Sequence, residues 1–83
     1  MRKVISVEAF DYYLVCDLDD GNTYKYDMRF LLRRAGEMVL LLRSIDFFQK
    51  VFIESGALSW PNDYSIHANT IERDGHKIST TNL

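Results

Sequence analysis

The chain has 83 residues, of which 47% are hydrophobic and 13% aromatic, and its formal net charge is −2. This length accommodates one domain, and the apolar content suffices for one hydrophobic core, which argues against an intrinsically disordered protein. Dedicated nucleic-acid-binding domains are usually strongly basic, so the net negative charge makes nucleic acid an unexpected partner.

The first third of the sequence predicts a three-stranded antiparallel meander. Positions 4–9 alternate and are rich in β-branched residues, and further strand-like runs cover 13–18 and 23–26. The second and third runs are separated by Asp19-Asp20-Gly21-Asn22. This tetrad predicts a hairpin, because glycine takes the positive φ that such turns require.

Short helices are expected next. Asp27 can cap a helix N-terminus, and the apolar residues that follow it have helical spacing, with a helix end near Gly36. Positions 38–42 are apolar throughout and fit either a strand or a buried helical turn. Ser44 is a second candidate N-cap, and positions 45–50 are typical of a short helix.

A second pair of strands follows these helices. Positions 51–54 and 57–60 are strand-like, and the Ser55-Gly56 pair between them predicts another hairpin. Pro61 ends the pairing, because proline has no amide donor. Positions 64–71 are expected to be irregular or to form a short helical turn.

Residues 1–73 are therefore assigned to a single α+β domain, in which an antiparallel sheet and short helices form two layers. The polar residues 74–83 are expected to be a frayed tail or to make oligomer contacts. Because the edges of a small sheet are open, we expect that a homodimer can form, with positions 78–81 adding a strand to a neighbouring copy.

The string Trp60-Pro61-Asn62 contains the only tryptophan and the only proline of the chain. Together with the order of the elements, it resembles the small bacterial family catalogued as domain of unknown function 2442. The resemblance covers about residues 2–72. The matching pieces are Arg2-Lys3-Val4-Ile5-Ser6-Val7-Glu8, Asp20-Gly21, Tyr26-Asp27-Met28, Ile45-Asp46-Phe47-Phe48 and the strand from Gly56 to Asn62.

The chain also departs from the family pattern. The family usually continues Trp-Pro-Asn with Gly and later has Asp and Pro, where this chain has Asp63, Ser65 and Ala68. Phe30 stands where a Pro is common. The resemblance implies no settled activity. Some members are fused to a helix-turn-helix domain, and many lie beside small genes in arrangements that resemble toxin–antitoxin pairs.

Trp60, Asn62 and Asp63 form the first group of candidate interaction residues. A conspicuous aromatic residue next to polar turn residues suits a partner contact. The structural alternative is that Trp60 packs onto the helices while Asn62 closes the turn after the strand by bonding local backbone amides.

Arg29, Arg33 and Arg34, with Arg43 as a further member, form the second group and the only basic cluster of the chain. Guanidinium groups can contact an acidic partner or phosphates. The structural alternative is the solvated face of a short helix.

No catalytic, cofactor or metal site is expected. Asp63 and His67 are spaced four apart, but a metal needs at least three ligands, and no Cys-x-x-Cys or His-Glu-x-x-His pattern is present. Asp17, Asp19 and Asp20 lie at a predicted hairpin tip, where solvated residues are typical. The chain has no glycine-rich phosphate loop and no serine nucleophile elbow, so an enzyme is not expected.

Cys16 is the only cysteine and lies in an apolar run. It is expected to be a buried, unreactive residue of a cytoplasmic protein, since a single thiol forms no intrachain disulfide. The longest apolar stretch, 38–42, is far shorter than the ~20 residues that a membrane-spanning helix needs, so no membrane association is expected.

The sequence therefore favours a small non-enzymatic protein–protein interaction module. Its expected partner is the product of an adjacent gene, in a pair that resembles toxin–antitoxin systems. The alternative is a ligand-sensing or DNA-associated regulatory domain, which the fusions to helix-turn-helix domains suggest.

Overall fold

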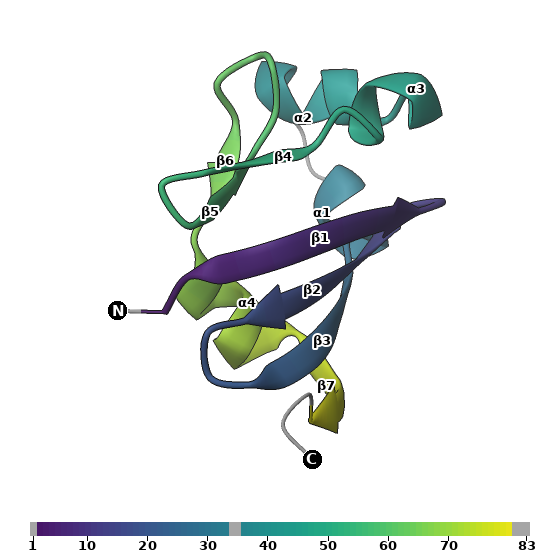
Figure 1. Ribbon diagram of the computed structural model, residues 1–83. Helices are drawn as coiled ribbons and strands as arrows, with labels where there is room; N and C mark the ends of the chain where they lie inside the picture. Colours follow the sequence, from purple (N-terminus) through teal and green to yellow (C-terminus); the bar gives the residue numbers. More distant parts are fainter. Residues whose placement is uncertain (1, 34–35, 81–83) are drawn as a thin grey trace.

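The computed structural model describes residues 2–33 and 36–80, which form two antiparallel sheets with short helices around them (Figure 1). The larger sheet comprises, in spatial order, β1 (Val4–Phe10), β2 (Tyr13–Leu18), β3 (Asn22–Asp27) and β7 (His76–Thr80). The smaller sheet comprises β4 (Phe52–Glu54), β5 (Ala57–Ser59) and β6 (Ser65–Ile66). The helices are α1 (Arg29–Leu32), α2 (Glu37–Leu42), α3 (Ile45–Phe48) and α4 (Ala68–Asp74). The α+β class predicted from the sequence is confirmed.

Alternation along β2 decides which face of the larger sheet is covered. Leu14, Cys16 and Leu18 are buried, whereas the residues between them are only half-buried. The register pairs Cys16 with Tyr24 and Leu14 with Tyr26. Because directly opposed residues share a face, the two buried tyrosines of β3 extend the same inner face.

The hydrophobic core joins this inner face to the smaller sheet and the helices. Leu58 and Ile66 pair across β5 and β6 and are both buried. Ile71 of α4 and Phe48 of α3 are fully buried in the same cluster. Burying a side chain of this size contributes about 1.5–3 kcal/mol, so the shared core is the main force that holds the two sheets together.

Both predicted glycine-containing hairpins are confirmed. The loop between β2 and β3 has Gly21 at φ 82°, and the Gly21 amide donates to the Leu18 carbonyl over 3.2 Å. The loop between β4 and β5 consists of Ser55 and Gly56, at φ 52° and 80°. Two consecutive positive φ values are typical of the tight turns that suit the twist of a two-residue hairpin.

The helices are short and lie close to where the sequence predicts them. Ser44 caps α3, and its hydroxyl accepts from the Phe47 amide over 3.5 Å. The Asp27 carboxylate accepts from the Arg29 amide over 3.0 Å, although the residue that caps α1 is Met28. The segment 38–42, left open between strand and helix, belongs to α2. No helix in the described part of the chain has the length and apolar character that crossing a membrane requires.

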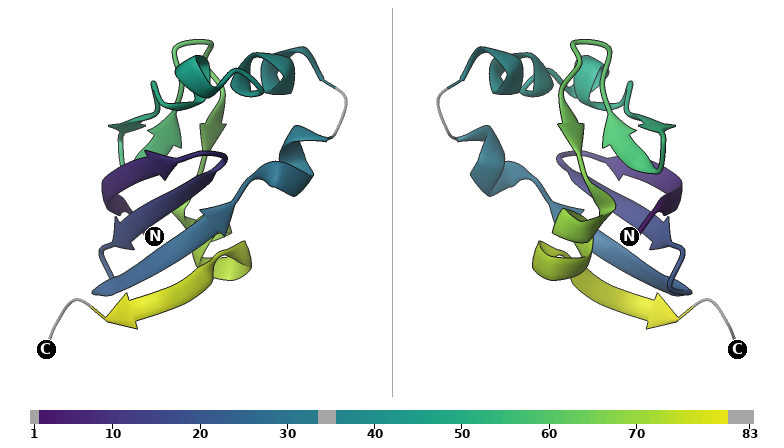
Figure 2. Two further views of the ribbon diagram at one scale, coloured as in Figure 1. Left: turned by 90° about the vertical axis from the view of Figure 1, so that its right-hand side faces the viewer. Right: turned by 90° about the vertical axis from the view of Figure 1, so that its left-hand side faces the viewer.

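The C-terminal part of the chain is more ordered than we predicted. The segment 64–71 contains β6 and most of α4. The predicted frayed tail is corrected over His76–Thr80, which form β7 and pair with β3 of their own chain (Figure 2). The sequence pattern did not predict this strand because its side chains are polar. The strand is ordered by backbone pairing with β3. Residues 81–83 lie outside the described residues, and the homodimer stays a prediction.

The two sheets meet where the loop between β4 and β5 touches the start of β1. The Val4 amide donates to the Gly56 carbonyl over 2.8 Å. A Cβ atom on Gly56 would lie 2.8 Å from Cγ and 2.9 Å from Cβ of Lys3. Only glycine therefore fits this junction, for reasons of both backbone conformation and space.

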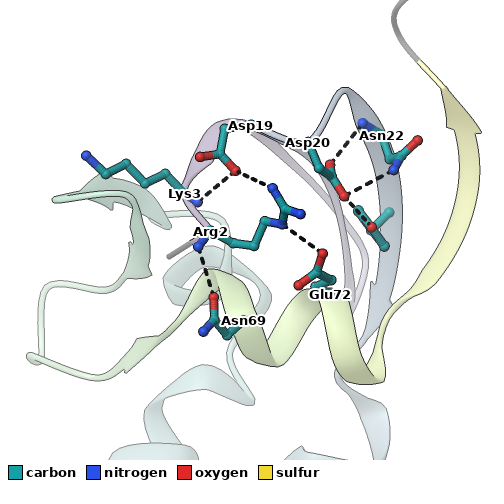
Figure 3. Close-up of polar contacts among 8 residues, drawn as sticks. Arg2, Lys3, Asp19, Asp20, Asn22, Asn69 and Glu72 are labelled. Atoms are coloured by element: carbon teal, nitrogen blue, oxygen red, sulfur yellow. Dashed lines mark hydrogen bonds and ion pairs between the residues drawn. The ribbon is translucent and has the colours of Figure 1, made fainter.

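Arg2 fastens the start of the chain to two other elements (Figure 3). Its backbone amide donates to Asn69 Oδ1 over 3.1 Å, and its guanidinium pairs with Glu72 of α4 at 2.8 Å and with Asp19 at 3.7 Å. Beside it, burial raises the pKa of Asp20, but hydrogen bonds from Tyr24 and Asn22 outweigh burial, so this pKa lies below its usual value. The carboxylates of Asp19, Asp20 and Glu72 each have a partner, so we assign these contacts a structural role.

Cys16 is expected to resist thiol reagents in the native state. Burial, and secondarily the charge of Asp17, raise the pKa of the Cys16 thiol to about 12, and only the thiolate is a strong nucleophile. Incubation with an aromatic disulfide reagent at pH 8 should label the protein only after denaturant is added. Rapid labelling without denaturant would show that β2 opens readily.

Candidate functional site

Trp60 lies in the core rather than on the surface. Its side chain is 1% exposed, and its indole Nε1 donates to the Phe48 carbonyl over 2.9 Å. The rings of Tyr12, Phe48, Trp60 and Tyr64 follow one another with centroid separations of 5.7, 6.0 and 5.8 Å. Trp60 is thus the central part of an aromatic row, as the structural alternative predicted.

Between β5 and β6, Trp60 and Tyr64 close a three-residue loop that consists of Pro61, Asn62 and Asp63. The Asp63 amide donates to the Trp60 carbonyl over 3.0 Å, and the Trp60 amide donates to the Tyr64 carbonyl over 2.9 Å. Asn62 Oδ1 accepts from the Tyr64 amide over 3.3 Å. Pro61 takes the second position of the turn, which its fixed φ favours. The predicted local bond from Asn62 to a backbone amide is confirmed.

Asp63 has φ 68°, a left-handed conformation that favours glycine. It is the third residue of its loop, the position that Gly21 takes in the loop between β2 and β3. Asp63 therefore places a carboxylate at a strained backbone position that a glycine would occupy without strain.

Replacing Asp63 by glycine is expected to stabilise the fold by up to about 1 kcal/mol. The left-handed conformation costs a residue with a Cβ about 1–2 kcal/mol, and the greater freedom of glycine in the unfolded chain offsets part of that gain. Chemical unfolding followed by circular dichroism measures the difference. Asp63→Ala is the matched control, because it removes the carboxylate and keeps the strain. A destabilised Asp63→Gly variant would show that the carboxylate itself supports the loop.

The second candidate group lies at a surface depression of about 320 Å³ beside α1. We call it the arginine depression. Its lining is Tyr12, Arg29, Leu32, Arg33 and Arg43. In Figure 2, α1 follows β3 and lies beyond the end of the larger sheet. Three of the lining residues are arginines, and no acidic residue belongs to the described lining.

Two of these arginines are held in place. Arg29 pairs with Asp27 at 2.7 Å, and hydrogen bonds from its guanidinium lower the pKa of the Asp27 carboxyl. Arg43 Nε donates to the Leu32 carbonyl over 2.7 Å, which ties the end of α2 to the end of α1. The Tyr12 hydroxyl donates to the Arg43 carbonyl.

Arg33 differs from these two arginines, since the structure gives it no carboxylate partner within residues 2–33 and 36–80. It lies at the C-cap of α1, where a positive charge is favourable. Its side chain is exposed. The third predicted arginine, Arg34, lies outside the described residues.

Exposed apolar side chains accompany the arginines on the same two helices. Phe30 of α1 and Leu40 and Leu41 of α2 are each 50% exposed. Large apolar side chains next to arginine are enriched in protein–protein interfaces, whereas lysine and acidic residues are depleted there. Helices α1 and α2 thus present the composition of an interface.

The structure does not bring the two predicted groups into one pocket. Arg29 and Arg33 line the arginine depression, whereas Trp60 and Asp63 line a separate groove on the smaller sheet. The aromatic row connects them, because Tyr12 lies at one end and Tyr64 at the other. Sequence reasoning named Arg43 but missed Leu32, whose contribution depends on how α1 and α2 pack.

The remaining candidates are Asp63 with His67 and the aspartates of the hairpin between β2 and β3. Asp63 and His67 do not share a helix, because Asp63 lies in the loop and His67 is the N-cap of α4. Asp17 accepts from the hydroxyls of Ser6 and Thr23 on the larger sheet. Among the described residues, no three histidine, cysteine or acidic side chains gather closely enough to hold a metal ion.

Comparison with known proteins gives one match. Neither the curated proteins nor the solved structures contain a match to this chain. The model of the family described as "Protein of unknown function (DUF2442)" matches residues 4–77, which span all seven strands at least in part and all four helices. The chain therefore belongs to the family of proteins of unknown function DUF2442.

Proposed function

We propose that this domain is a non-enzymatic protein–protein interaction module that binds an acidic segment of a partner protein at the arginine depression. The supporting observation is that Arg29, Arg33 and Arg43 line one depression in a chain whose net charge is −2. The local positive charge opposes the overall charge, so it attracts an acidic segment without making the whole surface basic.

The proposal extends to the source of the partner. The genomic arrangement typical of the family suggests the product of an adjacent gene, in a pair that resembles toxin–antitoxin systems. A cytoplasmic location belongs to the same proposal and suits the buried, unpaired Cys16. The alternative occupants are DNA, in a regulatory domain, and a small ligand.

Co-expression of the chain with each neighbouring open reading frame, followed by titration of the purified pair, tests the proposal. Arg33→Glu should weaken the complex about tenfold or more, because it places like charges opposite one another. Arg73→Glu is the matched control, since Arg73 is an exposed arginine of α4 that pairs with Asp74 outside the depression. Its effect should be less than about twofold.

Two outcomes would contradict the proposal. One is the absence of any complex with the neighbouring products. The other is binding to a DNA duplex that falls steeply with added salt and is lost in Arg33→Glu, which would establish the regulatory alternative.

A further inference from the structure

The outer face of the smaller sheet carries a groove of about 350 Å³, which we call the sheet groove. Side chains alternate along β5, so that Leu58 points into the core and Ser59 points to the groove. The register places Ser59 opposite Phe52 on one side and opposite Ser65 on the other. These three residues form a cross-strand row in the groove.

Ser59 is unusual because it is a buried polar residue without a partner. It is 5% exposed, and its hydroxyl makes no hydrogen bond to any residue in the described part of the chain. No fully buried side-chain oxygen or nitrogen of the described residues lacks a partner, so this hydroxyl opens onto the groove. The Ser59 hydroxyl is therefore available to a group that enters the groove.

The charge of the groove is negative. Glu54 and Asp63 contribute carboxylates, and no lysine or arginine belongs to its described lining. Phe52 and Pro61 supply apolar walls, whereas the ring of Trp60 lies in the core. Carboxylates beside aromatic surface suit a planar cation, because a guanidinium pairs with carboxylates and stacks on flat apolar groups.

We propose that the sheet groove is a binding site for a guanidinium group, in which the Ser59 hydroxyl accepts an N–H and Asp63 and Glu54 balance the charge. The side chain that carries the bound guanidinium group lies against Phe52 and Pro61. This site is separate from the arginine depression and does not depend on the proposed function. It also gives a functional reason for a carboxylate at position 63 in spite of the strain of the left-handed backbone.

Titration of the isotope-labelled full chain with N-acetyl-arginine amide tests the proposal by NMR. The backbone amide resonances of β5, of Trp60 and of the loop after it should shift, with a dissociation constant on the order of 1 mM for so small a probe. N-acetyl-citrulline amide has the same shape without the charge and should bind at least about tenfold more weakly. A titration with free arginine distinguishes the two possible sources of the guanidinium group. If free arginine binds more tightly than the amide, the ligand is a small molecule. If free arginine binds more weakly, the ligand is an arginine side chain of a peptide.

Variants locate the site. Ser59→Ala and Asp63→Gly should each weaken binding of the arginine probe about tenfold, and Asp63→Gly is compatible with the loop conformation. Glu8→Gln is the matched control, because Glu8 is an exposed carboxylate of β1 outside the groove. The proposal fails if citrulline and arginine probes bind equally, if the shifts map elsewhere, or if the arginine probe causes no shifts at concentrations well above the expected dissociation constant.

Discussion

Replacing Trp60 by alanine is expected to lower the free energy of unfolding by about 3–5 kcal/mol, as for other buried aromatic residues. The side chain is fully enclosed and contacts Phe48 and Tyr64 on either side. Removing it leaves a cavity and leaves the Phe48 carbonyl without the donor that it has at 2.9 Å. Small domains are stable by only about 5–15 kcal/mol in total, so this variant should lie near the limit of folding.

Chemical denaturation followed by far-ultraviolet circular dichroism measures this effect, since the variant has no tryptophan fluorescence. Trp60→Phe is the companion variant, because it keeps an aromatic ring and loses the indole donor. It should cost about 1–3 kcal/mol. A Trp60→Ala protein with normal stability that no longer bound its partner would instead make Trp60 an interaction residue.

Replacing Gly56 by alanine is the second large effect that we expect, and it should lower the free energy of unfolding by about 2–5 kcal/mol. The positive φ of 80° contributes about 1–2 kcal/mol for any residue with a Cβ. The new methyl group also meets Lys3, whose Cα lies 3.3 Å from the ideal Cβ position. Forced contacts of this kind typically cost about 1–3 kcal/mol, and they push β1 away from the loop that holds the Val4 amide.

Gly36→Ala separates the two contributions. Gly36 also has a positive φ, at 149°, but no atom of residues 2–33 or 36–80 lies within 4 Å of its ideal Cβ position. The same chemical-denaturation experiment should therefore give a smaller loss for Gly36→Ala than for Gly56→Ala. Equal losses would show that backbone conformation alone accounts for the effect at Gly56.

Local patterns predicted the elements whose determinants lie close together in the sequence. Asp20-Gly21 and Ser55-Gly56 predicted their hairpins because a tight turn depends on a few adjacent residues. The alternation along β2 predicted a buried face because the period of two is a property of the strand itself. Ser44 predicted the start of α3 because an N-cap depends only on the residues next to it.

The missed features depend on contacts between distant residues. β7 has a polar composition and pairs with β3 far back in the chain. α4 has only Ala68 and Ile71 as buried residues, too few for a helical period to stand out. At the candidate sites, the charge of Arg33 was evident from the sequence. The unpaired hydroxyl of Ser59 was not, because a serine is identified as buried only after β5 is placed between β4 and β6.

The pairing of β3 with β7 also bears on synthesis. On the ribosome, β3 can pair with β2 at once, but its other edge has no partner until positions 76–80 have emerged. At about 5–20 residues per second this interval lasts several seconds. An exposed strand edge is a template for pairing with another chain. The nascent chain is therefore most exposed to aggregation when the meander has formed and the last strand has not yet been made.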